Sequence, residues 1–250
     1  MPIRIAIPEP TSRDPEYNTR SLPPYIAALQ ACGAIPTLVP LHERQDRVAQ
    51  LLAGTQGVLL PGSRFDVDPE RYGDSRIPEC GPSDPERAAV DELLLQDAFN
   101  LHKPILAICH GMQTLNVWLN GTLIQHLPAV SSVDHAPGRD VIDAHLIQIE
   151  EGSMLQLLND KGEATDFVNS SHHQAIARLG DRLTASAVSG EDGVIEAVEI
   201  DALGQFVLGV QWHPERTFAA KPLSRAIFKS FVDAASRWQP APSTVAEAAR

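Results

Sequence analysis

Residues 104–119 read PILAICHGMQTLNVWL, and this stretch decides the fold class. An apolar run ends at Ile108 and a helical pattern begins near Gly111, so Cys109 occupies a turn between a buried strand and a helix. Ala107 and Gly111 are small residues placed two positions before and two positions after the cysteine. This spacing is typical of a nucleophile elbow, in which a sharp turn exposes the reactive side chain.

The position of Cys109 also predicts an activated thiol. The N-terminus of a helix carries roughly half of a positive charge, which favours thiolate over thiol. The backbone N–H of His110 begins the same helix, and we expect it to bind a developing oxyanion. Ligands of parallel sheets bind at the carboxyl ends of the strands, where Cys109 lies. Because a buried, inert cysteine would give the same pattern, the interpretation requires a base.

A histidine follows a second apolar strand. Residues 209–215 read GVQWHPE, and His213 lies just beyond the strand end. Histidine suits a general base because its unperturbed pKa is about 6.5. Pro214 fixes the backbone before Glu215, whose carboxylate can accept a hydrogen bond from the imidazole and hold its tautomer. We therefore predict that Cys109, His213 and Glu215 form a catalytic triad.

Strands and helices alternate in the first half of the chain. Apolar runs bounded by proline or glycine predict strands, and helical spacing of apolar residues predicts helices. Loop residues extend to Arg20 before the first helix, which Gly33 ends. Further elements are expected at 3–7, 35–39, 44–53, 58–60, 85–102, 104–108 and 111–119. This alternation favours a parallel sheet with helices on both faces.

The second half contains mostly strands. They are expected at 145–149, 183–188, 195–200 and 206–210, with an antiparallel hairpin around 201–204. A last helix is predicted over 221–238. With no repeat or linker, we predict a single domain over 1–238 and a flexible C-terminal tail over 239–250. The long loop 61–85 is rich in Pro, Gly and Asp, and loops of that length are usually functional.

Composition narrows the class of function. The chain has 250 residues, of which 43% are hydrophobic, enough for a substantial core. Its net charge of -12 argues against nucleic acid as a partner, since nucleic-acid binders carry a basic face. No apolar stretch of about 18 residues predicts a membrane span. The N-terminus is too short and proline-broken for a signal peptide, so we expect a cytoplasmic protein.

The three cysteines predict neither disulfides nor a metal site. The number of cysteines is odd, and Cys32, Cys80 and Cys109 are widely spaced without a CxxC pair. Cys32 fits a buried helix position, and Cys80 lies in the long loop without an evident partner. No cluster of metal ligands is visible in the sequence, so neither a metal nor an organic cofactor is expected.

Five segments in order resemble the class I glutamine amidotransferase superfamily. The match is closest to its γ-glutamyl hydrolase branch, the peptidase C26 group typified by γ-glutamyl-γ-aminobutyrate hydrolase. The segments are YIAALQACGAIPTLVP (25–40), PGSRFDVDPERYG (61–73), ILAICHGMQTLNVWLNGTLIQHL (105–127), VNSSHHQAI (168–176) and GVQWHPE (209–215). The resemblance implies an α/β, flavodoxin-like three-layer sandwich. Its central sheet is mostly parallel, with helices on both faces and an added antiparallel portion.

The resemblance also implies roles for individual residues. The triad would be Cys109, His213 and Glu215, and the oxyanion hole would use backbone N–H groups near Gly62 and of His110. Gln113 would help to hold the substrate amide. The remaining substrate-binding positions are backbone groups of Ser170, Ser171 and His172, which would approach the γ-glutamyl α-amino and α-carboxyl groups. For His172 and His173, a purely structural, hydrogen-bonded role is an equal alternative.

Three departures from the family pattern bear on function. Ala107 replaces the usual elbow glycine, but it is still small. Ser63 stands where a second glycine is frequent, which affects the direction of the loop N–H groups. After the long loop the family shows Arg-Asp followed by Glu, whereas this chain has Arg87, Ala88 and then Asp91. Because those acidic positions lie near the site mouth in relatives, the leaving-group preference is expected to differ.

The predicted activity is therefore hydrolysis of a γ-glutamyl amide through a thioester, with a small molecule as substrate. The sequence does not identify the amine that leaves, since γ-aminobutyrate, a polyamine adduct and other amines all fit. Loops 61–85 and 131–143 are expected to determine which amine is accepted. One alternative is a glutaminase subunit that passes ammonia to a partner synthetase, since the chain lacks a GxxxxGK[ST] motif. Another is a non-catalytic binding module of the same fold. A homodimer is common among such relatives.

Overall fold

A nine-stranded sheet forms the centre of the molecule, in the order β2-β1-β3-β4-β11-β10-β9-β6-β7. The computed structural model describes residues 2–159, 162–200 and 204–240. Five strands are parallel: β1 (Ile3–Pro8), β2 (Ala34–Val39), β3 (Gly57–Leu60), β4 (Ile105–Ile108) and β11 (Val207–Val210). Four antiparallel strands extend it: β10 (Ile195–Glu199), β9 (Thr184–Ser189), β6 (His145–Ile149) and β7 (Thr165–Val168). A separate pair joins β5 (Thr122–Ile124) to β8 (Ala175–Arg178).

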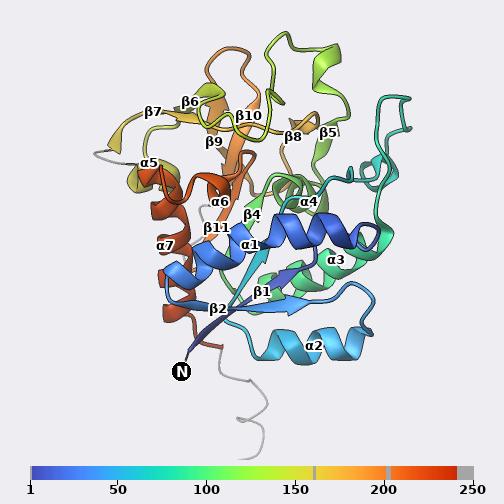
Figure 1. Cartoon of the computed structure of the whole chain (residues 1–250), viewed down its shortest axis with the longest axis vertical. Coiled ribbons are helices and arrows are strands. Elements are labelled where there is room, and N and C mark those ends of the chain that lie inside the picture. Colours follow the sequence, from blue (N-terminus) through green and yellow to red (C-terminus); the bar gives the residue numbers. More distant parts are fainter. Residues whose placement is uncertain (1, 160–161, 201–203, 241–250) are drawn as a thin grey trace, which may run out of the picture.

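Helices cover both faces of the parallel part, which gives three layers (Figure 1). On one face are α1 (Pro15–Ala31) and α7 (Pro222–Arg237), and on the other are α2 (Gln45–Ala53), α3 (Pro85–Asn100) and α4 (His110–Trp118). Two short helices are α5 (Met154–Leu158) and α6 (Pro214–Thr217), and 3-10 turns lie at Pro69–Tyr72 and Leu127–Ala129. The predicted fold class, a mostly parallel sheet with an added antiparallel portion, is confirmed.

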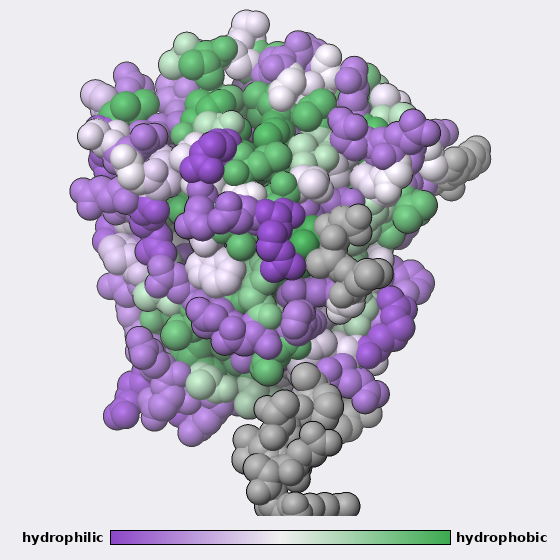
Figure 2. Space-filling model, turned by 180° about the vertical axis from the view of Figure 1, so that it is seen from behind, coloured by the Kyte–Doolittle hydropathy of each residue, from purple (hydrophilic) through white to green (hydrophobic). Residues whose placement is uncertain are grey.

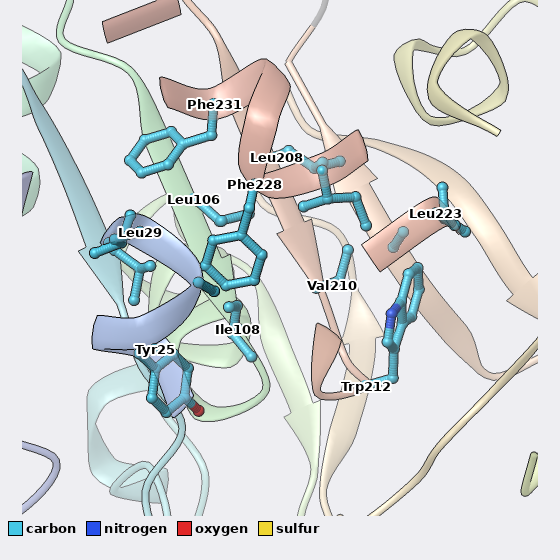
Figure 3. Close-up of a cluster of buried hydrophobic side chains, with 14 of the residues drawn as sticks. Tyr25, Leu29, Leu106, Ile108, Leu208, Val210, Trp212, Leu223, Phe228 and Phe231 are labelled. Atoms are coloured by element: carbon cyan, nitrogen blue, oxygen red, sulfur yellow. The ribbon is translucent and has the colours of Figure 1, made fainter. Parts of the chain in front are cut away.

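Strand side chains alternate between the two helical layers. In β4, Leu106 and Ile108 belong to the core under α1 and α7, whereas Ile105 and Ala107 belong to the core under α2, α3 and α4. Because both faces are buried, the strand is a continuous apolar run without a polar alternation. Figure 3 shows the first of these cores, with Phe228 and Phe231 of α7 over the strands and Tyr25 of α1 at its edge.

The first helix begins earlier than the sequence predicted. It starts at Pro15 rather than after Arg20, because the side chain of Asp14 accepts a hydrogen bond from a first-turn N–H and caps it. Prolines 23 and 24 lie inside the helix. They remove donors for the carbonyls of Thr19 and Arg20, but both residues are exposed, so water can replace the missing bonds. The apparent loop residues are therefore helical.

The second half contains elements that the sequence did not predict. Strands β7 and β8 and helix α5 are each four or five residues long, too short to show periodicity. The expected hairpin is confirmed in that β10 and β11 pair antiparallel, although residues 201–203 of its turn lie outside the described residues. Most of the predicted tail, 241–250, also lies outside them, so its flexibility stays a prediction.

Polar residues cover much of the face shown in Figure 2, with apolar residues between them. Among the described residues, no helix has the length and apolarity needed to cross a membrane. Among the described residues, most large apolar side chains are buried in the two cores beside the sheet. The chain as a whole carries a surplus of acidic residues.

Helix α4 packs directly against the end of β3. A β-carbon added to Gly111 would lie 2.3 Å from the carbonyl oxygen of Leu60, closer than any real contact allows. Glycine is therefore required by the close approach of the two backbones. This contact fixes the direction in which the helix leaves the turn at Cys109.

We predict that Gly111→Ala destabilises the protein by about 1–3 kcal/mol, because the added methyl group forces a packed helix away from a strand backbone. Gly54→Ala is the matched control, since its nearest neighbour is a carbonyl at 3.5 Å and its backbone needs no positive φ. Urea unfolding of both variants measures the difference. Equal midpoints for the two variants would contradict the packing argument.

Candidate active site

Cys109 lies at the turn between β4 and α4 in a strained backbone conformation. Its φ of 52° and ψ of -109° fall in a region that residues with a side chain rarely adopt. The turn is held because the N–H of Cys109 donates to the carbonyl of Val210 at 2.8 Å. Cys109 is only 5% exposed. The predicted elbow is therefore present in its geometry.

His213 and Glu215 lie just beyond the carboxyl end of β11, next to β4 in the sheet. Nδ1 of His213 is 2.8 Å from Oε1 of Glu215, and both side chains are buried. The backbone of His213 is fixed on both sides by Asn169, whose Oδ1 accepts from its N–H and whose Nδ2 donates to its carbonyl, each at 2.8 Å. The imidazole is thus oriented through its ring and through its backbone.

Gly62 marks the point where these groups meet. A β-carbon placed on Gly62 would lie 2.9 Å from Cε1 of His213 and 3.6 Å from Cβ of Cys109, so the loop after β3 passes against both. The N–H of Gly62 donates to the hydroxyl of Tyr25 at 3.1 Å, and the same hydroxyl is 3.5 Å from Nδ1 of His213. Tyr25 therefore joins the loop to the histidine.

A pocket of about 190 Å³ opens beside the cysteine. It is lined by the elbow, by the loop after β3 and by the segment between β7 and β8. Among its residues are Cys109, His110, Gln113, Ser63, Arg64, Asp66, Ser171, His172 and His173. The pocket thus combines a cysteine thiol with polar side chains and with charged side chains of both signs.

The predicted thiolate is not supported, because burial outweighs the helix N-terminus. Burial raises the pKa of the Cys109 thiol to about 12, although Arg216 and the N–H of His110 act to lower it. Burial also lowers the pKa of His213 below its ordinary value, against the effect of Glu215. These shifts favour a thiol at Cys109 and a neutral imidazole at His213 at pH 7, so a nucleophilic role for Cys109 would require the transfer of a proton from its sulfur.

Of the predicted substrate-binding residues, some line the pocket and others are hydrogen-bonded within the protein. Ser171 and His172 line the pocket, but the hydroxyl of Ser170 and the N–H of His172 both donate to the carbonyl of His135, at 2.6 and 3.0 Å. Gln113 lines the pocket, and its amide nitrogen donates to the Gln174 carbonyl at 3.0 Å. The N–H groups of Gly62 and His172 are thus engaged within the protein, whereas Ser171 borders the pocket.

Asp91 is not at the mouth of the site, contrary to the expectation from family relatives. It is fully buried, and its Oδ1 accepts from Nε of Arg87 at 2.7 Å. Arg87 in turn donates to the carbonyls of Pro10 and Pro61, at 2.9 and 2.8 Å. Arg87 and Asp91 are four residues apart, so their side chains lie on one face of α3. The pair thus supports the backbone at Pro61, directly before Gly62, through a buried hydrogen bond.

Sequence reasoning missed Asn169, Tyr25 and Arg87 as residues that support the site. Each acts on a segment far away along the chain: Asn169 is 44 positions from His213, and Tyr25 is 37 positions from Gly62. A polar residue inside an otherwise apolar helix pattern was the available signal for Tyr25. For Asn169 the signal was its place inside VNSSHHQ, immediately before the predicted pocket residues.

A second polar cluster lies behind the pocket. His135, His145, His172 and Glu196 are all buried, and one ligating atom of each lies within 4.8 Å of the others. No cluster of metal ligands was visible in the sequence, because these residues come from four separate segments. His172 therefore belongs both to the wall of the pocket and to this cluster.

This fold and this site define a glutamine amidotransferase-like α/β protein, with a cysteine and a histidine at the carboxyl edge of the sheet. A similar fold is found in a Thermoplasma acidophilum protein described as a GMP synthase subunit, with a TM-score of 0.61 and 14% identity over 94% of this chain and 95% of that one. The chain belongs to the Peptidase C26 family, whose model matches residues 8–215.

Two relatives are similar over most of their length. A Lactococcus lactis protein named as glutamine amidotransferase-like is 34% identical over 212 residues, covering 84% of this chain and 86% of the relative. A protein of Escherichia coli O157:H7 named gamma-glutamyl-gamma-aminobutyrate hydrolase is 35% identical over 219 residues, covering 84% of each. The family and these relatives support a hydrolase or an amidotransferase-like protein.

We predict that alkylation of Cys109 by iodoacetamide accelerates with pH throughout the range 6–10. A thiol with a pKa of about 12 is protonated below that value, so the thiolate fraction grows about tenfold with each pH unit. Mass spectrometry of the peptide that contains Cys109 separates its modification from that of Cys32 and Cys80. A rate that is already constant between pH 6 and 8 would show a stabilised thiolate instead.

We predict that Asn169→Ala lowers kcat about 10²-fold with little change in KM, because His213 loses two backbone hydrogen bonds and shifts relative to the nucleophile. Asn169→Asp can still accept from the N–H of His213 but cannot donate to its carbonyl, so its kcat should be intermediate. Steady-state kinetics on a hydrolysed substrate tests the order. Equal kcat values for wild type and Asn169→Ala would exclude a positioning role.

Proposed function

We propose that the protein hydrolyses γ-glutamyl amides to glutamate and an amine, with Cys109 as nucleophile. The observation that carries this proposal is the meeting of the Cys109 elbow and the His213–Glu215 pair around Gly62, beside an open pocket. The Escherichia coli relative named gamma-glutamyl-gamma-aminobutyrate hydrolase supports the same substrate class.

In the first step the sulfur of Cys109 attacks the γ-carbonyl carbon while neutral His213 accepts the thiol proton. Glu215 stabilises the imidazolium that forms, since its carboxylate lies 2.8 Å from Nδ1. The tetrahedral intermediate breaks its C–N bond, and His213 gives the proton to the leaving amine. Water then attacks the γ-glutamyl thioester, His213 takes a proton from that water, and the proton returns to sulfur as glutamate leaves.

The oxyanion of the tetrahedral intermediate needs two backbone donors. The N–H of His110 begins α4 and interacts with the sulfur of Cys109, which supports its assignment as one donor. The sequence predicted the second donor near Gly62, but the N–H of Gly62 itself donates to Tyr25. We assign the second role to the N–H of Ser63, the next residue, which also lines the pocket.

The charges around the pocket fit the two ends of a glutamyl group. Arg64, whose guanidinium also pairs with Asp14, provides a cation for the α-carboxylate, and Asp66 provides an anion near the α-amino group. Asp66 also lies 2.9 Å from Nε2 of His173, and this contact is the main cause of the raised pKa of His173. Ser171 adds polar groups from the segment between β7 and β8. The amine that leaves is not defined by these residues.

A glutaminase subunit is the second candidate. It is favoured by the relatives named as glutamine amidotransferase-like proteins, and the same chemistry would then release ammonia from glutamine for a partner synthetase. Glutamine differs from other γ-glutamyl amides only in its leaving group, so one pocket serves both reactions. The distinguishing property is whether the isolated chain turns over a larger amide without a partner.

We predict that the purified protein releases glutamate from at least one member of a panel of γ-glutamyl amides. The panel contains γ-glutamyl-γ-aminobutyrate, γ-glutamyl polyamines and glutamine, and an enzymatic glutamate assay measures release. Cys109→Ala should reduce the rate by at least about 10³-fold, as the loss of a nucleophile does. Cys32→Ala is the matched control and should retain full activity, because Cys32 follows the end of α1 and does not line the pocket.

Three outcomes separate the candidates. Release from a substituted amide that requires Cys109 supports the hydrolase. Release from glutamine alone, increased by an added synthetase, supports the glutaminase subunit. No release from any substrate, together with a Cys109 that fails to react with an electrophilic glutamine analogue, would support a non-catalytic binding module and overturn the proposal.

A further inference from the structure

Three histidines and one glutamate meet in a closed space behind the pocket. His135 lies in the loop before β6, His145 begins β6, His172 lies between β7 and β8, and Glu196 lies in β10. Their side chains are at most 2% exposed. The segments are far apart in the sequence, so the fold itself brings the four side chains together.

The distances around Glu196 match those of a tetrahedral metal site. Its Oε1 lies 3.3 Å from Nδ1 of His135, 3.4 Å from Nε2 of His145 and 3.5 Å from Nε2 of His172. In a tetrahedral zinc site with bonds of about 2.0–2.1 Å, two ligand atoms are separated by roughly 3.3–3.4 Å. The histidine nitrogens lie within 4.8 Å of one another, so a bound ion would draw them closer by up to about 1.4 Å to complete the tetrahedron.

The inward atoms of the cluster lack well-formed hydrogen bonds. By distance and angle, no described residue forms one with either oxygen of Glu196, with Nδ1 of His135 or with Nε2 of His145 and His172, although these nitrogens face Glu196 and His135 and His172 act to lower its pKa. A fully buried carboxylate is costly unless a cation or several donors compensate its charge. The two carboxylate oxygens and the three histidine nitrogens without well-formed hydrogen bonds therefore all lie in the same small buried space. That arrangement is expected where a cation is the missing partner.

The outward atoms of two histidines are oriented as in metal sites. Nε2 of His135 lies 2.9 Å from Oδ2 of Asp192, and Nδ1 of His172 lies 2.9 Å from the carbonyl of Gln174. Histidines that bind a metal usually donate their other N–H to a carboxylate or a backbone carbonyl, which fixes the tautomer and turns the free lone pair inward. Nδ1 of His145 has no such partner among the described residues.

We propose that His135, His145, His172 and Glu196 bind one divalent transition-metal ion, with Zn²⁺ as the ion best suited to this ligand set. Imidazole nitrogens and one carboxylate favour zinc over magnesium or calcium, which prefer oxygen ligands. Four protein ligands and complete burial leave no open position for a substrate, so the site is structural. This proposal does not rest on the proposed hydrolase activity.

The ion would connect the pocket to the rest of the sheet. His135 belongs to the loop 131–143, and its neighbour Ala136 lines the pocket together with His172. The metal would join this loop and the pocket segment to β6 and β10. We therefore assign to the metal the role of fixing one wall of the pocket, without contact with the reacting atoms.

The test is a metal titration of the full chain carrying Cys109→Ala, which removes the active-site thiol as a competing ligand. The protein is stripped with a chelator and then titrated with Zn²⁺, or with Co²⁺ as a coloured substitute. We expect one equivalent to bind, the visible absorption of tetrahedral Co²⁺, and slower tryptic cleavage at the exposed Arg139. Binding below about 0.1 equivalent at micromolar Zn²⁺, or an octahedral Co²⁺ spectrum, would overturn the site.

Variants locate the ion. His145→Asn and Glu196→Gln should each weaken Zn²⁺ binding by at least about 100-fold, whereas His173→Asn should leave it unchanged. His173 is the matched control, because it follows His172 directly but bonds to Asp66 instead of the cluster. Circular dichroism shows whether each variant is folded. Unweakened binding in folded His145→Asn or Glu196→Gln would overturn the proposal, and if neither folds, the Co²⁺ spectrum of the parent chain decides.

Discussion

The strained turn at Cys109 is the constraint on which the rest of the site depends. A residue with φ of 52° and ψ of -109° is not stable by itself, so its surroundings must hold it. They do so through the hydrogen bond to Val210 of β11 and through the close contact of Gly111 with Leu60 of β3. The turn therefore links three neighbouring parallel strands, and the segments that follow β3 and β11 meet at the cysteine.

The segments that meet at Cys109 bury backbone polar groups, and nearby side chains form hydrogen bonds with these groups. Arg87 satisfies the carbonyl of Pro61, Tyr25 accepts from Gly62, and Asn169 satisfies both backbone groups of His213. The same burial keeps Cys109 protonated, which changes the role of the helix N-terminus. In the proposed mechanism its N–H stabilises charge as the charge develops, because Arg216 and this N–H offset the effect of burial on the Cys109 pKa only in part.

The sequence predicted the structure best where a single local pattern covers one strand or helix. The run before Cys109 and the GVQWHPE segment predicted the sheet and the meeting of Cys109, His213 and Glu215, because parallel strands end at a common edge. It was least informative where distant residues cooperate. The Arg87–Asp91 pair looked like a departure at the site mouth, but only the fold shows that both side chains point into the protein. The start of α1 was missed because two prolines hid a helix that Asp14 caps upstream.

The adjacent residues His172 and His173 explain how one short segment can serve two sites. Their side chains lie in opposite directions: His172 is buried against Glu196, whereas His173 is 38% exposed and bonds to Asp66 at the pocket. An extended backbone turns successive side chains to opposite sides, so a segment between two strands can contact the interior cluster and the pocket at once. The sequence left both histidines between a structural and a binding role. In the structure both residues line the pocket, but His172 faces Glu196 and His173 pairs with Asp66, so the wall of the pocket and the cluster behind it share one stretch of backbone.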